Sequence, residues 1–243
     1  MSVSELFSRR TLVMLAVLML LTATAVFAVY ESERRAIVSV RVAGELRHTS
    51  RVALQSVVSA HAASSLYRVD VASVRDAALT QAWVKDASVR RVWPDSLHIA
   101  VVEREPVARW RQSGLLEADA SVFYPPSLEV FAELPMLEGP DGTESEVLHR
   151  YEEISRLISS VSRRVAHLSL DERRAWQIEL DNGILLVLGQ NQNDAALRRF
   201  VSVFYAVLQA DPSQLERVDL RYTNGFAVLW KTKPLAQIEG EQG

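Results

Sequence analysis

The feature that most constrains this chain is an uncharged apolar stretch near its beginning. Residues 11–30 contain no charged side chain, no proline and no glycine, and most of them are Leu, Val, Ala or Met. As an α-helix rising about 1.5 Å per residue, the stretch would reach roughly 30 Å, the thickness of the hydrocarbon core of a bilayer. Because a helix satisfies its own backbone groups, the stretch predicts a transmembrane segment.

A cleaved secretory signal is the alternative for this stretch, because Ala23-Thr24-Ala25 has the small-residue pattern of a cleavage site. The core of a signal is only about 7 to 15 residues long, and the apolar character here continues past Ala25, which favours an uncleaved anchor. Arginines flank both sides of the span and do not set its orientation. Since a short tail, residues 1–10, precedes the span and a long domain follows it, we expect the tail in the cytoplasm and the folded part outside.

Composition argues against several function classes. The 27 Lys+Arg and 30 Asp+Glu leave a net charge of −3, so no basic field is available for nucleic-acid phosphates. The chain has no cysteine, and therefore no disulfide, thiolate metal site or thiol nucleophile. The five histidines stand at no metal-ligand spacing: His48, His61, His98, His149 and His167. We expect a binding protein without metal, cofactor or catalytic residues, although a hydrolase whose triad assembles from distant residues stays open.

The segment after the span, residues 31–105, predicts a strand, two helices and two more strands. The strands are expected at residues 37–42, 84–92 and 97–102, where apolar and polar side chains alternate or a turn such as 93–96 intervenes. Thr49 or Ser50 would cap the first helix and Asp70 the second, which ends near Trp83. Each helix has one apolar face: Leu54, Val57 and Val58 in the first, and Val74, Ala77 and Ala78 in the second.

Residues 106–232 indicate a second unit of several short strands interrupted by two helices. Thr143 and Glu146 have the spacing of a capping box, which predicts the start of the first helix. Its apolar positions follow at steps of three and four: Val147, Tyr151, Ile154, Ile158 and Val161. The second helix is expected from Asn193 to Asp211-Pro212. Its apolar stripe is Leu197, Phe200, Val201, Phe204 and Leu208.

Two hairpins are predicted in this unit. One joins residues 176–180 to 184–188 through Asp181-Asn182-Gly183, and the other joins 215–222 to 226–230 through Thr223-Asn224-Gly225. In the last strand we expect Phe226, Val228 and Trp230 to face one way and Ala227 and Leu229 the other. Because Pro234 stops further pairing, residues 233–243 would form a flexible tail and the last strand a sheet edge.

Two motifs carry a resemblance. The first is W-P-D at residues 93–95 followed by E-x-x-P-x-A-x-W at 103–110, and the second is V-D-L-R-Y at 218–222, followed by Gly225, Ala227, Val228 and Trp230. Together with the short tail and single span, they resemble the FtsQ/DivIB family of bacterial cell-division proteins, in particular its FtsQ branch. The resemblance implies an α+β fold class: one transmembrane helix, a POTRA domain over 31–105, and a mixed β domain over 106–232 with a C-terminal hairpin.

The resemblance also implies a function. Such proteins are non-catalytic scaffolds of the division machinery in the inner membrane at the division septum, with the folded domains in the periplasm. They recruit FtsB and FtsL through the end of the β domain, while the POTRA domain and the span are linked to other division proteins. An edge strand at residues 226–230 offers a mechanism, because a partner segment can add to the sheet there. A POTRA-bearing envelope assembly or secretion factor, which would carry a β-barrel downstream, is the alternative.

Individual residues follow from the resemblance by position. Tyr222, Gly225, Ala227, Val228 and Trp230 match the partner-contact strand of the family, and Arg174 and Arg221 match basic residues that meet partner carboxylates. Phe226 lies inside the same strand and is counted with this site. Phe226 and Leu229 are bulky where relatives carry small residues, so the local contacts are expected to differ.

Overall fold

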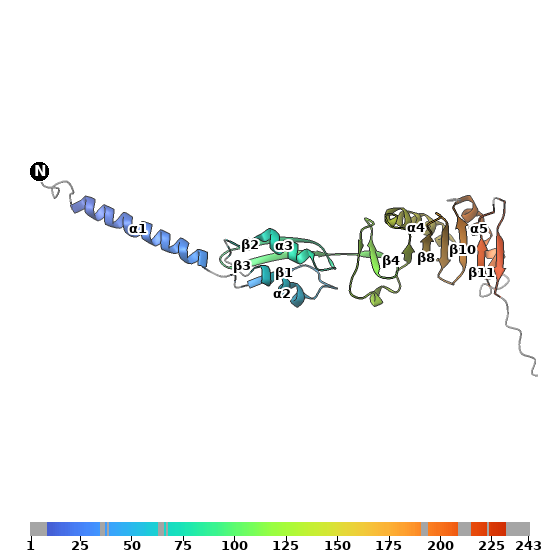
Figure 1. Ribbon diagram of the computed structural model, residues 1–243, viewed down its shortest axis with the longest axis horizontal. Coiled ribbons are helices and arrows are strands. Elements are labelled where there is room, and N and C mark those ends of the chain that lie inside the picture. Colours follow the sequence, from blue (N-terminus) through green and yellow to red (C-terminus); the bar gives the residue numbers. More distant parts are fainter. Residues whose placement is uncertain are drawn as a thin grey trace, which may run out of the picture. The chain divides into compact units, whose positions relative to one another are not determined.

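The computed structural model of the chain describes residues 9–34, 37, 39–62, 66, 68–190, 194–208, 215–222 and 224–231. It falls into two units, Met1–Arg104 and Glu105–Gly243 (Figure 1). Each unit has a hydrophobic core of its own.

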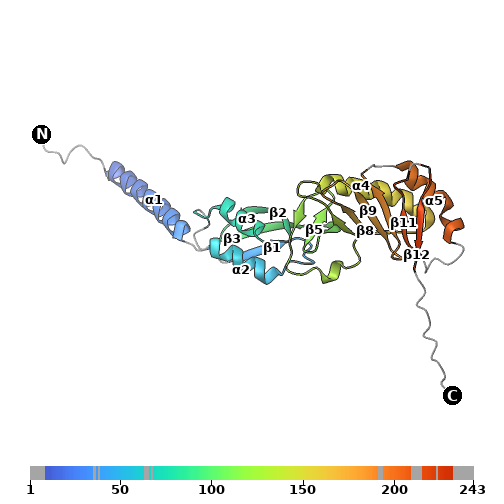
Figure 2. The same cartoon turned by 45° about the vertical axis from the view of Figure 1, so that its right-hand side comes forward.

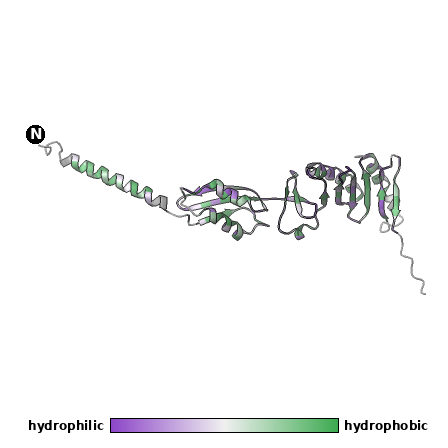
Figure 3. Cartoon of the chain, in the orientation of Figure 1, coloured by the Kyte–Doolittle hydropathy of each residue, from purple (hydrophilic) through white to green (hydrophobic). Residues whose placement is uncertain are grey.

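Helix α1 spans Arg9–Arg34. Within it, Thr11–Tyr30 has a mean hydropathy of 2.7 and is not buried against the rest of the chain. Figure 3 colours most of this stretch as hydrophobic. The Thr24 hydroxyl donates to the Leu20 carbonyl at 2.8 Å, so even this polar group finds its partner inside the helix. By length and composition α1 can cross a bilayer.

The rest of the first unit has the predicted order of strand, two helices and two strands. The elements are β1 Ser39–Ala43, α2 Arg51–His61, α3 Val71–Leu79, β2 Val84–Val92 and β3 Ser96–Glu103. In the sheet β3 lies between β1, to which it is parallel, and β2, to which it is antiparallel. The helices bury Leu54, Val58 and Val74 against this sheet.

The helix caps of this unit agree with the sequence, with one choice resolved. Ser50 caps α2, since its hydroxyl accepts from the Ala53 N–H, and Asp70 caps α3. The Thr49 N–H instead donates to a carboxylate oxygen of Glu103 at 2.6 Å. Burial opposes ionisation of Glu103, but hydrogen bonds from Thr49 and from the backbone of residues 47–49 outweigh it and lower the pKa of this carboxyl. The predicted end of α3 near Trp83 is wrong, because the helix closes at Leu79.

In its described residues, the second unit contains one mixed sheet of nine strands with two α-helices. The strands are β4 Pro106–Trp110, β5 Gly114–Glu117, β6 Val122–Phe123, β7 Met136–Glu138, β8 Val165–Leu170, β9 Trp176–Leu180, β10 Leu185–Gly189, β11 Leu215–Asp219 and β12 Ala227–Trp230. The helices are α4 Glu144–Ile158 and α5 Asp194–Leu208. Along the sheet the order is β12-β11-β10-β9-β8-β7-β4-β5-β6, with β10 and β11 parallel and β11 and β12 antiparallel.

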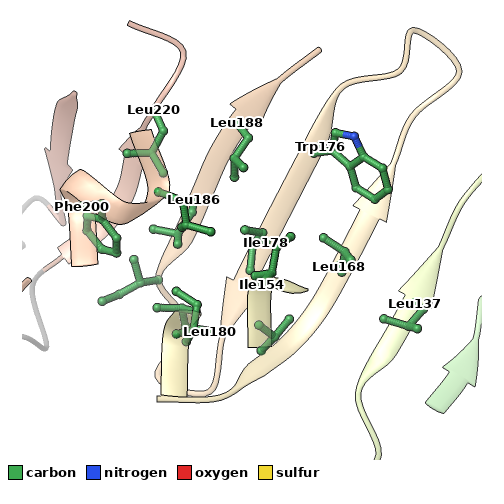
Figure 4. Packing of buried hydrophobic residues seen from close by; sticks show 14 of the residues in the cluster. Leu137, Ile154, Leu168, Trp176, Ile178, Leu180, Leu186, Leu188, Phe200 and Leu220 are labelled. Atoms are coloured by element: carbon green, nitrogen blue, oxygen red, sulfur yellow. The ribbon is translucent and has the colours of Figure 1, made fainter. Parts of the chain in front are cut away.

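The core of this unit lies between the helices and one face of the sheet. Ile154 of α4 and Phe200 of α5 pack in one cluster with alternate strand residues, among them Ile178 and Leu186 (Figure 4). In β9 the burial alternates residue by residue, with Gln177 and Glu179 exposed. The opposite face of the sheet, called here the helix-free face, therefore carries the other residue of each alternating pair.

The capping box predicted at the start of α4 is wrong. Thr143 is the N-cap, but its side chain makes no cap hydrogen bond, and its hydroxyl donates to the Pro140 carbonyl at 2.7 Å instead. Glu146 is engaged by Arg174. Strand β11 ends at Asp219, three residues earlier than predicted. The expected start of the second helix at Asn193, its end at Asp211-Pro212 and the flexible tail lie outside the described residues.

Candidate partner-binding edge

Strand β12 is the last strand at one end of the nine-stranded sheet. It pairs with β11 on one side, with Val218 opposite Val228 and Asp219 opposite Ala227, and within the part of the chain that the structure describes no strand pairs with its other side. Figure 2 shows β12 beside β11 at this end. An edge of this kind presents a row of N–H and C=O groups that a second chain can use to extend the sheet.

The side chains of this hairpin alternate between two faces. Phe226 and Val228 pack against the hydrophobic core, and the ring of Phe226 meets that of Phe200 edge-on at 6.0 Å between centroids. Ala227 and Leu229 are exposed on the helix-free face. Trp230 lies opposite Leu215, a core residue, yet 40% of its surface is exposed. The alternation predicted from the sequence is therefore present, and Phe226 uses its bulk inward rather than along the edge.

The connection before β12 brings two more of the predicted residues to the surface. Tyr222 is 56% exposed. Among the described residues, no atom lies within 4 Å of a Cβ added at Gly225. Nothing in the described part of the unit therefore demands a glycine at position 225.

Arg221 is held in place by two neighbours. Its guanidinium donates to both carboxylate oxygens of Asp219, at 2.8 and 3.0 Å from Nε. Its aliphatic part lies over Gly189, where a Cβ would come within 3.0 Å of the arginine Cγ. The hydrogen bonds from Arg221 lower the pKa of Asp219, and Asp219 in turn raises the pKa of Arg221. The result is a half-exposed cation fixed at the end of the sheet.

Arg174 occupies the turn between β8 and β9 with a left-handed φ of 65°. Its N–H donates to the Asp171 carbonyl at 2.9 Å, and its guanidinium pairs with Glu146 of α4. Trp176, which follows this turn, lies opposite Gly189, the residue that contacts Arg221. The two arginines therefore lie at the same end of the sheet, each beside a carboxylate of its own chain.

The structure thus groups most, but not all, of the predicted site. Arg221 and Ala227 lie together at one end of the β11–β12 pair, and Trp230 lies at the other end of β12, about 10 Å from Ala227 for three residues of extended chain. Arg174 lies at the same end of the sheet as Arg221, but beside β9, three strands away from β12. A partner must run along the whole strand to contact both ends.

Sequence reasoning missed Asp219 and Gly189. The first had a local signal, because Asp219 and Arg221 are two residues apart in extended chain and so share a face. Gly189 had no local signal in the sequence, since its contact with Arg221 depends on the parallel pairing of β10 with β11. The histidines form no cluster in the described ranges, where no group of three or more His, Cys, Asp or Glu side chains could hold a metal ion.

An apolar helix able to span a membrane, followed by a small β-α-α-β-β unit and a β domain whose last described strand is unpaired on one side, defines a class: membrane-anchored proteins with an edge strand open to pairing. Comparison with known proteins narrows this class. Residues 35–104 match the family described as "POTRA domain, FtsQ-type" and residues 108–221 match "Cell division protein FtsQ/DivIB, C-terminal". The second match ends at Arg221, before β12.

Individual relatives agree over most of the chain. The cell division protein FtsQ of Neisseria gonorrhoeae is 31% identical over 241 residues, covering 98% of this chain and 97% of its own length. That of Coxiella burnetii is 34% identical over 184 residues, 76% of each chain. That of Xanthomonas campestris is 36% identical over 198 residues, 81% of this chain and 70% of its own.

The chain belongs to the FtsQ family of cell-division proteins. It is a single-pass inner-membrane protein with a role in the divisome. The family is not known as a class of enzymes.

Proposed function

We propose that this protein is a non-catalytic divisome scaffold that recruits the periplasmic segments of FtsB and FtsL by strand addition at β12. It would thereby link early and late division proteins, with further partners bound through the POTRA domain and the transmembrane segment. The observation that carries the proposal is the uncovered edge of β12, which combines open main chain with the exposed side chains of Tyr222 and Trp230. Aromatic side chains of this kind are the usual anchors of protein interfaces.

The charges at one end of this edge support the proposal. Arg221 lies there, about half exposed, and can hold a carboxylate while the main chain of the partner pairs with β12. Arg174, also about half exposed, lies at the same end of the sheet but three strands away, beside β9, where it can meet a carboxylate farther along the partner. Phe226 packs on Phe200 of α5 and so holds the start of the strand against the core before a partner arrives. A preformed edge lowers the total entropy cost of binding, because the edge itself needs no further ordering.

The first experiment replaces the two exposed aromatic anchors. Tyr222→Ala and Trp230→Ala are each expected to weaken capture of the FtsB/FtsL complex by about 10-fold, the effect of a typical interface anchor. Their unfolding temperatures should stay near that of the unchanged protein, because both side chains are about half exposed. Unaltered affinity in both variants would rule out binding at this edge.

The second experiment works in dividing cells. Site-specific crosslinkers at positions 222 and 230 are expected to capture FtsB or FtsL, and a crosslinker at the exposed Val130 serves as the control. Capture of neither protein at positions 222 and 230 contradicts the proposal.

Membrane orientation is tested separately. A reporter enzyme fused after Gly243 should be active only when it is of a kind that works in the periplasm. Activity of a cytoplasmic reporter alone would reverse the proposed topology.

A further inference from the structure

The helix-free face of the sheet changes character toward β12. On β8 and β9 it carries Ser169, Gln177 and Glu179, with Gln177 and Glu179 exposed. On β10 it carries Leu185 and Val187, which lie opposite Glu179 and Gln177. The face is therefore polar over β8 and β9 and becomes apolar at β10.

On β11 the same face carries two charged residues, Arg217 and Asp219, and it becomes apolar again on the edge strand β12. Leu229 lies opposite Arg217, which in turn lies opposite Leu185, so these three residues form one row across β10, β11 and β12. Val187, Asp219 and Ala227 form the next row. Val187, at the inner end of the second row, is only 5% exposed, whereas Leu229, at the outer end of the first row, is 52% exposed. A large apolar side chain thus ends the row with nothing from the described chain on its outer side.

We infer that Leu229 determines which segment can add to β12: the added strand must place an apolar side chain on the helix-free face, packed against Leu229. This inference rests on the proposed strand addition at β12 and names the chemistry of the segment that it selects. In neighbouring strands, directly opposed side chains on one face have Cβ atoms about 4.5–5.5 Å apart, and such pairs add to the stability of the sheet. An apolar partner would remove Leu229 from water, while a charged one would be desolvated against it.

The residues on either side of Leu229 define the rest of the pattern. Val228 faces the core side and is only partly buried, so the added strand needs an apolar residue there as well. Ala227 is small and exposed on the same face as Leu229, which leaves room for a larger side chain two residues along. The selected segment therefore has adjacent apolar residues on both faces, as a strand buried on both sides does, rather than strict alternation of apolar and polar residues.

Affinity measurements test the role of the Leu229 side chain. With the full chain in detergent or nanodiscs and the periplasmic segment of FtsB from the same organism as probe, Leu229→Ser is expected to raise Kd about 3- to 10-fold. Leu229→Met should restore most of the affinity. Glu179→Ser, on the same face three strands inward, and Val130→Ser, at an exposed apolar site elsewhere, are matched controls that should leave Kd unchanged. All four variants should unfold near the temperature of the unchanged protein.

Disulfide crosslinking tests the geometry, and the absence of cysteine from the chain makes the experiment clean. Leu229→Cys is combined with a cysteine scan of the probe segment, and Val228→Cys with the same scan. Strand addition brings opposed Cβ atoms close to disulfide range, so each of the two cysteines should crosslink to alternate probe positions, and the two sets should interleave. The positions that crosslink to Leu229→Cys should be apolar in the natural segment.

The outcomes separate this inference from the proposed function. If Leu229→Ser binds as tightly as the unchanged chain while Tyr222→Ala and Trp230→Ala weaken binding, the edge is used but Leu229 does not select the segment, and the inference is overturned. Polar natural residues at the Leu229→Cys crosslinking positions would overturn it as well. If none of the edge variants changes Kd, strand addition at β12 itself fails.

Discussion

The two edges of the nine-stranded sheet differ in how much main chain they offer to another protein. Strand β6 is two residues long, and an exposed tyrosine and two consecutive prolines, Tyr124-Pro125-Pro126, follow it directly. Prolines have no N–H group, and short, proline-flanked edges resist pairing. Strand β12 is four residues long and consists of Ala, Val, Leu and Trp, with no charge and no proline. Within the residues that the structure describes, one edge is thus protected against pairing and the other is not.

The edges do not differ in how well they are anchored. Phe123 of β6 is 5% exposed and lies opposite Leu115, and Phe226 before β12 packs on Phe200. Both edges are therefore held to the protein, and the contrast lies on their outer sides. Because an unprotected apolar edge invites aggregation, its presence at one end of the described sheet supports the proposed strand addition there.

A proline scan should produce the largest effect. In an antiparallel pair, successive residues of β12 direct their N–H groups alternately toward β11 and outward. Proline at an outward position should weaken FtsB capture about 100-fold, the cost of a proline inside hydrogen-bonded structure, with little change in unfolding temperature. Proline at the intervening positions should lower the unfolding temperature. Isothermal titration and thermal unfolding measure the two effects.

The matched control is Tyr124→Pro, beside the β6 edge. Since Tyr124 is exposed and already precedes a proline, this change should leave both capture and stability unaltered. If it weakens capture as much as proline in β12 does, the contrast between the two edges is wrong.

Charge reversal at the end of the sheet should have the next largest effect. Arg221→Glu is expected to weaken capture about 10-fold at low salt and less at high salt, because a half-exposed ion pair is screened. Arg174→Glu should have a smaller effect, since Arg174 lies in the turn before β9, three strands away from β12, whereas Arg221 follows β11, the strand next to β12. Equal Kd values for the two variants, or an effect independent of salt, would contradict this ranking.

How much of the difference between the two edges the sequence could predict depends on how far apart along the chain the interacting residues lie. Local periodicity was enough for β12, its two faces and the hairpin with β11. The preceding strands β4, β5 and β8 were predicted only as unspecified short strands, because their positions in the sheet depend on parallel pairings such as β4 with β7 and β7 with β8. Such pairings leave no local signal, and neither does the order of nine strands.

The same distinction between local and long-range interactions applies to the candidate site. The spacing of Asp219 and Arg221 is local and predicts that they share a face, whereas the pairing of Arg174 with Glu146 joins two elements 28 residues apart. The wrong prediction of a capping box at Thr143 and Glu146 has the same cause. Glu146 pairs with the distant Arg174 instead of with the start of helix α4.

Truncating the support beneath β12 should have a moderate effect on stability and binding together. Phe226→Ala removes the edge-on contact with Phe200 and is expected to cost about 1–3 kcal/mol, less than for a fully buried ring because Phe226 is only partly buried. Capture should weaken along with stability, since the edge loses its rigid backing. Phe226→Leu, which refills most of the space, should recover both. Weakened capture in Phe226→Ala at unchanged unfolding temperature would instead indicate direct contact between Phe226 and the partner.

The smallest effect is expected from Asp219→Asn, and the dependence of its unfolding temperature on pH identifies the cause. The hydrogen bonds from Arg221 hold the pKa of Asp219 below its ordinary value of 3.8, so the ionised pair stabilises the folded protein above that pH. Its contribution disappears as the pH falls through the lowered pKa. The unfolding temperature of Asp219→Asn should therefore lie about 1–3 °C below that of the unchanged protein from pH 5 to 8, and the two should converge below pH 3.8. Because the half-exposed Arg221 keeps its own charge in this variant, capture should weaken less than in Arg221→Glu. Capture weakened as strongly as in Arg221→Glu would show that the placement of the guanidinium, rather than its charge, is what distinguishes this edge from β6.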